Sequence, residues 1–173
     1  MQLVLFKLCF SALIGLLLGV EREIKRKPLG VRTSMVICIA SCLITIISIE
    51  YTIRFSGMEE EGVRMDPLRL AAQIVSGVGF LGAGVIMWQG VNITGLTTAA
   101  LIWAASGMGI AVGAGFWKEA LIALVLIIIS VEIIPLIIKF IGPMRLKEKE
   151  FNITLIVDKG SSIERINEQV EKN

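Results

Sequence analysis

Few residues in this 173-residue sequence could take part in chemistry, and the first of them is an acid inside a long apolar run. Glu132 lies about 5 Å from the middle of the run 120–138, at a helical rise of about 1.5 Å per residue, and Pro135 follows it. An unpaired charge at such a depth in a membrane costs about 2.5–3.5 kcal/mol on insertion scales. Glu132 therefore either contacts a cation or handles a proton, or it is a neutral acid hydrogen-bonded to a neighbouring helix.

Two clusters of polar residues stand at the ends of apolar runs, one within residues 21–33 and one within 66–73. Their charged and amide residues include Glu21, Arg22, Glu23, Arg32, Asp66, Arg69 and Gln73. The first cluster either anchors the chain at an anionic lipid surface or forms a specific ion-pair or partner surface. Helix capping explains Asp66. Capping does not explain Arg69 and Gln73. Their side chains must find hydrogen-bond partners or water where the helix enters the membrane.

The absence of histidine narrows the chemistry further. Histidine is the usual general base at neutral pH and the commonest metal ligand, so no nucleophile with an adjacent base can be named and an enzyme is not expected. Asp66 and Glu132 are weak candidates as ligands of Mg²⁺, which prefers oxygen atoms and keeps several waters. No cofactor is expected, and Mg²⁺ would act as a ligand or a signal. The net charge of +2 gives no reason to expect nucleic acid as a partner.

Glycines are concentrated in two apolar runs. They are Gly77, Gly79, Gly82 and Gly84 in one, and Gly107, Gly109, Gly113 and Gly115 in the next. The string from Gly77 to Gly82 matches the dinucleotide-binding fingerprint, but that fingerprint follows a strand and opens a helix, whereas these glycines lie inside a helical run. Because glycines let membrane helices approach closely, we expect these two runs to pack tightly on each other. An oligomer interface or a broken helix lining a pathway are the alternatives.

The elements that must position these residues are membrane helices. Apolar residues make up 55% of the sequence and charged residues 18%, and this balance excludes a soluble globular fold. A transmembrane helix needs about 20 predominantly apolar residues, and five segments qualify. They are 3–20, 34–53, 70–88, 95–115 and 120–138. The predicted fold is an all-α polytopic membrane protein whose five-helix transmembrane domain covers residues 1–142.

Basic residues near the span ends predict the orientation. One basic cluster lies between residues 22 and 32 and another between 139 and 149, so both segments are expected in the cytoplasm. The N-terminus then lies outside and the C-terminus inside. A four-span arrangement would put one of the two clusters on the wrong side. Thr97 and Thr98 would open the fourth span from the inside.

The last part of the sequence changes character. After a basic linker at 143–150, residues 151–157 are rich in β-branched residues, as a strand is, and a helix is expected after the N-cap serines Ser161 and Ser162. One strand and one helix cannot bury a core, so 151–173 is expected to be an incomplete cytoplasmic α+β segment. This strand and the GxxxG surface of Gly15 and Gly19 would suit a homodimer, although one complete protomer could satisfy both.

Four strings of this sequence closely resemble the MgtC/SapB family: GVERE at 19–23, KPLGVRT at 27–33, DPLRLAAQIVSGVGFLGAG at 66–84 and GLTTAA at 95–100. The resemblance covers about residues 15–115, and the tail is similar to the start of the ACT-like cytoplasmic domain that many family members carry. Ser34 departs from the family pattern, in which a more polar residue such as His or Asn is expected.

The resemblance implies a bacterial plasma (inner) membrane protein that acts in magnesium homeostasis and adaptation to low Mg²⁺. Family members look like non-enzymatic regulators of membrane partners, including the ATP synthase and transporters, so such proteins and the lipid bilayer are the expected partners. A small Mg²⁺ or proton transporter or channel that uses intramembrane acids is the alternative. By motif position, the functional candidates are Glu21, Arg22, Glu23, Arg32, Asp66, Arg69, Gln73, the glycines of the third span, Thr97 and Thr98.

Overall fold

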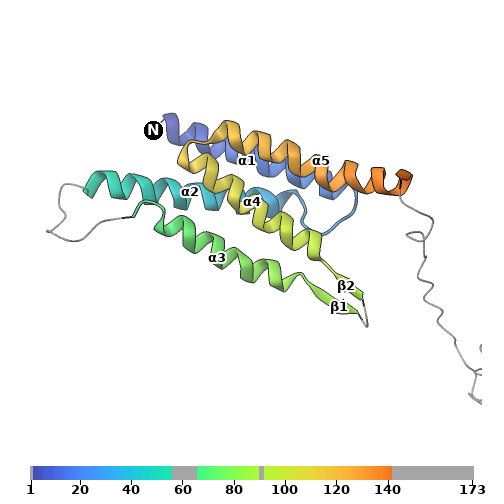
Figure 1. The fold of residues 1–173 in the computed structure, drawn as a ribbon. Coiled ribbons are helices and arrows are strands. Elements are labelled where there is room, and N and C mark those ends of the chain that lie inside the picture. The colour runs from blue at the N-terminus through green and yellow to red at the C-terminus, as the bar shows by residue number, and fades with distance from the viewer. Residues whose placement is uncertain (1, 56–65, 90–91, 142–173) are drawn as a thin grey trace, which may run out of the picture. The chain divides into compact units, whose positions relative to one another are not determined.

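The computed structural model describes residues 2–55, 66–89 and 92–141, and these residues are helical apart from one β-hairpin and short connections (Figure 1). The elements are α1 (Gln2–Ile24), α2 (Val31–Phe55), α3 (Arg69–Gly84), β1 (Met87–Gln89), β2 (Asn92–Thr94), α4 (Leu96–Ala114) and α5 (Trp117–Ile141). The chain divides into two units, Met1–Leu136 and Ile137–Asn173, and the second is described only over the end of α5. The expected linker at 143–150 and the α+β segment at 151–173 lie outside the described residues.

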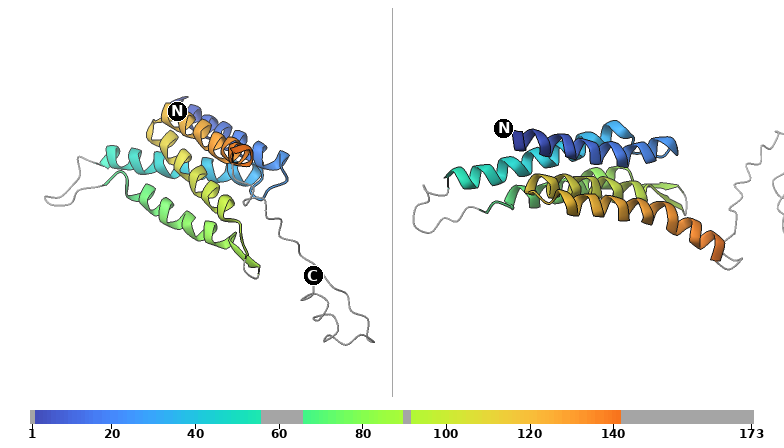
Figure 2. Two further views of the ribbon diagram at one scale, coloured as in Figure 1. Left: turned by 45° about the vertical axis from the view of Figure 1, so that its right-hand side comes forward. Right: turned by 90° about the horizontal axis from the view of Figure 1, so that it is seen from above.

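The helices α2 and α4 are the central elements of the first unit. They pack against each other, both contact α1, and both contact α3. Successive helices run antiparallel to each other (Figures 1 and 2). Contacts near both ends of α1 place the helix α5 beside it. Trp117 packs edge-on against Phe6 and Phe10 near the start of α1, and Glu132 contacts Lys25 just after its end. The end of this unit where α1 ends and α2 and α4 begin is called the charged end below.

Four of the described helices are long and apolar enough to cross a membrane: α1, α2, α4 and α5 over Trp117–Ile138. The third predicted span does not reach this length. Its helix has 16 residues and ends at Gly84, so the prediction that the span continues to residue 88 is wrong. The apolar content of residues 85–88 suggested a longer helix. However, Met87 and Trp88 instead pair with Thr94 and Ile93 in the hairpin, as aromatic and β-branched residues favour.

The interior of the first unit combines buried aliphatic residues such as Ile14, Leu18 and Leu124 with a row of small side chains on α2. One face of α2 carries this buried row at helical spacing: Ser34, Cys38, Ser41, Cys42 and Thr45. Large apolar side chains such as Leu43 and Ile47 point outward from the same helix. Because lipid chains are as apolar as leucine, helices in a membrane gain little from burying large side chains, and close packing of small ones holds them together.

Glycines of α1 and α4 meet this small-residue face of α2. A methyl group added to Gly19 would lie 2.5 Å from the Cα atom of Val31, and one added to Gly113 would lie 2.7 Å from the carbonyl oxygen of Cys42. Real Cβ atoms essentially never come so close to backbone atoms. The GxxxG surface of α1 is therefore occupied within the protomer.

The expected packing of α3 against α4 is present, but most of their glycines do not take part in it. Within the described part of the chain, Gly82 is the one α3 glycine whose added methyl would contact α4, at 3.6 Å from the Cβ atom of Ala99. Added methyls at Gly77, Gly79, Gly84 and Gly107 would have no described atom within 4 Å. The glycines of α4 that pack closely face α2 instead, because α2 presents the row of small side chains.

Polar atoms in this interior bond mainly to backbone carbonyls of other helices or of the preceding turn. Lys7 donates through Nζ to the Gly113 carbonyl at 2.8 Å, and Cys38 donates through Sγ to the Ala105 carbonyl at 3.2 Å. Thr45 donates to the Ser41 carbonyl one turn earlier, at 2.8 Å. These bonds connect α1, α2 and α4 where water is excluded, and an unpaired polar group there would be costly.

Candidate functional site

The charged end begins with an unusual termination of α1. The amide of Lys27 donates to the carbonyl of Arg22 and the amide of Arg26 donates to that of Glu23, both at 3.0 Å. This pair of bonds is the Schellman motif, whose left-handed position is usually glycine. Here Arg26 occupies that position with a φ of 52°.

One side of this turn holds an ion-pair cluster. Lys25 contacts Glu132 of α5 and lies with its Nζ 3.8 Å from Oε1 of Glu21. The predicted deep acid Glu132 therefore has a cationic partner at the end of α1. Sequence reasoning missed Lys25, because the two residues are far apart in the chain and only the packing of α5 beside α1 brings them together.

A double-mutant cycle tests this ion pair. We expect Lys25→Ala to lower the free energy of unfolding more in the wild-type chain than in a Glu132→Gln background. The side chain of Lys25 is 43% exposed, so the coupling energy should be about 0.2–1 kcal/mol, as for other exposed pairs. Thermal unfolding of the four purified proteins in detergent measures it. Strictly additive effects would show that the pair contributes nothing.

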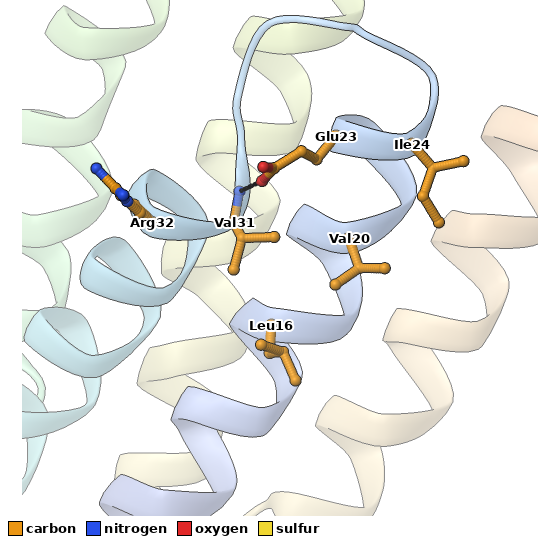
Figure 3. A pocket seen from close by; sticks show the side chains of 6 residues that line it. All are labelled: Leu16, Val20, Glu23, Ile24, Val31 and Arg32. Carbon is orange, nitrogen blue, oxygen red and sulfur yellow. Dashed lines mark hydrogen bonds between the residues drawn. The ribbon is translucent and has the colours of Figure 1, made fainter.

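A second acid holds the start of α2. Glu23 accepts a hydrogen bond through Oε2 from the amide of Val31 at 3.1 Å. Figure 3 shows this bond at the rim of a pocket of about 560 Å³, whose wall is formed by Leu16, Val20 and Ile24. Arg32 points away from Glu23 in this view. Glu23 thus has a structural role at the turn, and it does not pair with Arg32.

The other predicted residues of the charged end lie around the start of α4. Arg22 and Lys27 line a pocket of about 410 Å³ together with Thr97 and Thr98. Arg22 is 4% exposed although it is charged, and Thr98 is also 4% exposed. Two strings separated by about 70 residues of sequence, on α1 and α4, therefore meet in one pocket. Lys27 and Gly95 also line it, and sequence reasoning did not name them as functional.

The second polar cluster lies at the opposite end, where α3 begins. Asp66 accepts a hydrogen bond from the amide of Leu68 at 2.8 Å, so it forms a turn before α3, and the helix starts at Arg69. Arg69 and Gln73 lie one turn apart and are both exposed. Phe80, further along the same face, is 82% exposed. This side of α3 thus combines outward-facing polar and apolar groups.

The two weak metal candidates do not come together. Asp66 is adjacent to Pro67, whose carbonyl accepts a hydrogen bond from Ser48, and Glu132 contacts the turn just before α2. Val31 and Ser48 are about 26 Å apart along α2, at about 1.5 Å per residue. Within the described ranges, no group of three or more acids and cysteines is placed to hold a metal ion.

Four long apolar helices among the described residues, with many large apolar side chains facing outward, define this chain as a helical integral membrane protein with a cluster of charge at one end. Residues 8–140 match the model of the MgtC family, and the chain belongs to that family. It is 48% identical over 172 residues to Protein SapB of Bacillus subtilis, covering 98% of this chain and 73% of the relative.

Two other relatives match over different shares of their length. Protein MgtC of Salmonella typhimurium is 37% identical over 124 residues, which are 72% of this chain and 49% of the relative. "Putative magnesium transporter YhiD" of Escherichia coli is 32% identical over 159 residues, which are 92% of this chain and 71% of the relative. No solved structure matches the chain.

Proposed function

We propose that this protein acts in adaptation to low magnesium at the bacterial inner membrane, as a non-enzymatic regulator that contacts other membrane proteins. Membership of the MgtC family supports the connection with magnesium. The observation that carries the regulatory role is the outward face of α3. Arg69 and Gln73 are exposed on a helix that contacts the bundle through α2 and α4. Polar groups facing away from their own bundle in a membrane need a protein partner or water.

A topology of five crossings, with the N-terminus outside and the C-terminus in the cytoplasm, belongs to this proposal. Antiparallel packing of α3 with α4 supports it, because α3 runs between the same two ends of the unit as its neighbours (Figure 1). Its 16 residues cover about 24 Å at about 1.5 Å per residue, and the turn at Asp66 and the hairpin extend this length. The basic residues of the charged end favour the cytoplasmic side for that end.

Growth in low magnesium tests the regulatory role. In a strain that lacks its own copy, we expect the wild-type chain to restore growth and Arg69→Ala and Arg22→Ala to abolish it, with equal amounts of protein in the membrane by immunoblot. Arg54→Ala is the matched control for Arg69→Ala, because Arg54 is also an exposed arginine, in the last turn of α2, and it should grow normally. Normal growth of both the Arg69 and the Arg22 variants would contradict the proposal.

A small Mg²⁺ or proton transporter is the second candidate, favoured by the name of the E. coli relative. Glu132 would be its central acid. Its contact with Lys25 weighs against a cation site there, because the lysine already neutralises the carboxylate. Flux of Mg²⁺ or protons into proteoliposomes of the purified chain that is lost in Glu132→Gln would favour transport over regulation. No flux above that of empty liposomes would count against it.

A further inference from the structure

The pocket at the start of α4 has the composition of an anion site. Its volume is about 410 Å³, and its charged lining residues are the cations Arg22 and Lys27. The other lining residues are Pro28, Ile93, Thr94, Gly95, Leu96, Thr97 and Thr98. Among these described residues none is acidic, so the pocket carries a local excess of positive charge although the charged end as a whole contains several acids.

The first turn of α4 adds backbone donors to this pocket. Gly95 is the N-cap residue and has a left-handed backbone, with a φ of 89°, and no described side chain caps the helix. The first amide bonded to a preceding carbonyl is that of Ala99, which donates to Gly95 at 2.9 Å. The amides of Leu96, Thr97 and Thr98 precede it and have no carbonyl within the helix to bond. The start of a 19-residue helix also carries partial positive charge.

An independent observation comes from Arg22. Its side chain lines the pocket and is buried, yet its Nε atom has no hydrogen-bond partner among the described residues. Nearly all buried donors in proteins are paired. Glu23 accepts a hydrogen bond from the amide of Val31. Glu21 forms only a longer ion pair with Lys25, at 3.8 Å, and its buried Oε1 atom also has no hydrogen-bond partner among the described residues. The described contacts thus leave Nε of this buried guanidinium unpaired, and Arg22 lines the pocket in which an anion can bind.

We propose that this pocket binds a phosphate group. A tetrahedral phosphate offers several strong acceptor oxygens and one or two negative charges. Arg22 and Lys27 supply charge, the amides of the first turn of α4 supply directed donors, and the exposed hydroxyl of Thr97 supplies a further donor. The phosphate could belong to an anionic lipid headgroup or to a soluble phosphate compound. Binding here does not depend on the regulatory role proposed above.

Thermal unfolding of the full chain, purified in a maltoside detergent that contains no phosphate, tests this site. The probes are sodium phosphate and a short-chain phosphatidic acid, with sodium chloride at equal ionic strength as the reference. We expect phosphate or phosphatidic acid to raise the unfolding midpoint of the wild-type chain in a saturable way. Saturation by inorganic phosphate indicates a soluble ligand, and saturation by phosphatidic acid alone indicates a lipid headgroup.

Three variants locate the binding. Arg22→Gln, Lys27→Gln and Thr97→Val should each weaken the apparent affinity at least tenfold. The second and third change exposed side chains, so they remain informative if Arg22→Gln does not fold. Arg32→Gln is the control, because it removes a cation of the same end that does not line this pocket. No saturable effect of either probe on the wild type, or equal affinities in Lys27→Gln, Thr97→Val and Arg32→Gln, would overturn the proposal.

Discussion

Gly109→Val should remove most of the folded protein. A Cβ atom at this position would collide with the carbonyl oxygen of Cys38 and would lie 2.9 Å from the Cβ atom of Ser41. The first of these atoms belongs to the backbone of α2, so it cannot rotate away, and α2 and α4 must separate to admit the new side chain. Overpacking of a core costs typically about 1–3 kcal/mol and occasionally more, and we expect at least about 3 kcal/mol here.

A neighbouring glycine provides the control for this prediction. Gly107 lies on the same helix, and an added methyl group there would have no described atom within 4 Å. Gly107→Val therefore carries the same change of helix propensity without the collision. Thermal unfolding and gel filtration of both variants in detergent should show a folded, monodisperse Gly107→Val and a destabilised or aggregated Gly109→Val. Equal stability of the two would show that α2 and α4 do not pack as closely as described.

Gly95→Ala should disrupt the connection between the hairpin and α4. Gly95 has a φ of 89°, and a methyl group there would collide with the carbonyl oxygen of Val85 at the end of α3. The variant thus combines backbone strain, about 1–3 kcal/mol for a residue other than glycine in such a conformation, with a clash between two backbones. Together these effects should displace the start of α4 from the end of α3.

Gly115→Ala separates the two contributions. Gly115 has a similar φ of 98°, but the space around its added methyl group is free of described atoms within 4 Å. It should lose about 1–2 kcal/mol of unfolding free energy from strain alone, and Gly95→Ala should lose clearly more. Unfolding midpoints measured in the same detergent compare them. A smaller loss for Gly95→Ala than for Gly115→Ala would contradict the close approach of α3 to Gly95.

Much of the fold could be predicted from the sequence, because the length and position of an apolar run are local properties. The predicted runs 3–20, 34–53, 95–115 and 120–138 coincide with α1, α2, α4 and α5 to within about one helical turn at each end. The third run failed at residues 85–88. Its hydrophobicity is as suitable for a strand as for a helix, and the pairing of Trp88 with Ile93 decided between them.

Helix contacts could be predicted less well. The glycines of the third and fourth runs suggested a mutual interface. The two helices do contact each other, but Gly109 and Gly113 pack on α2 instead. A signal for this partner was present, because Ser34, Cys38, Ser41, Cys42 and Thr45 recur at helical spacing and form a face of small side chains. Composition alone does not show which small-residue faces of the helices contact each other, because several arrangements of the helices would bury each face.

The candidate site shows the same limit. Its members Arg22, Thr97 and Thr98 were identified from their unusual places in the sequence, at the ends of apolar runs. That they line one pocket follows from the packing of α1 and α4 on α2, which brings distant segments together. In the sequence, Lys25 and Lys27 both look like ordinary basic residues that flank a membrane span. Nothing in their local sequence indicated that Lys25 contacts Glu132 and that Lys27 lines the pocket.

The row of small buried side chains on α2, with large apolar side chains facing outward, also governs how stability depends on temperature. Unfolding of a water-soluble domain exposes apolar area to water, which gives a large positive heat-capacity change and a curved stability profile. Separating α2 from its neighbours within a bilayer exposes residues such as Ser34 and Cys38 to lipid chains, and outward residues such as Leu43 keep their surroundings. Helix separation should therefore have a heat-capacity change near zero, so this fold would not weaken on cooling as water-soluble domains do.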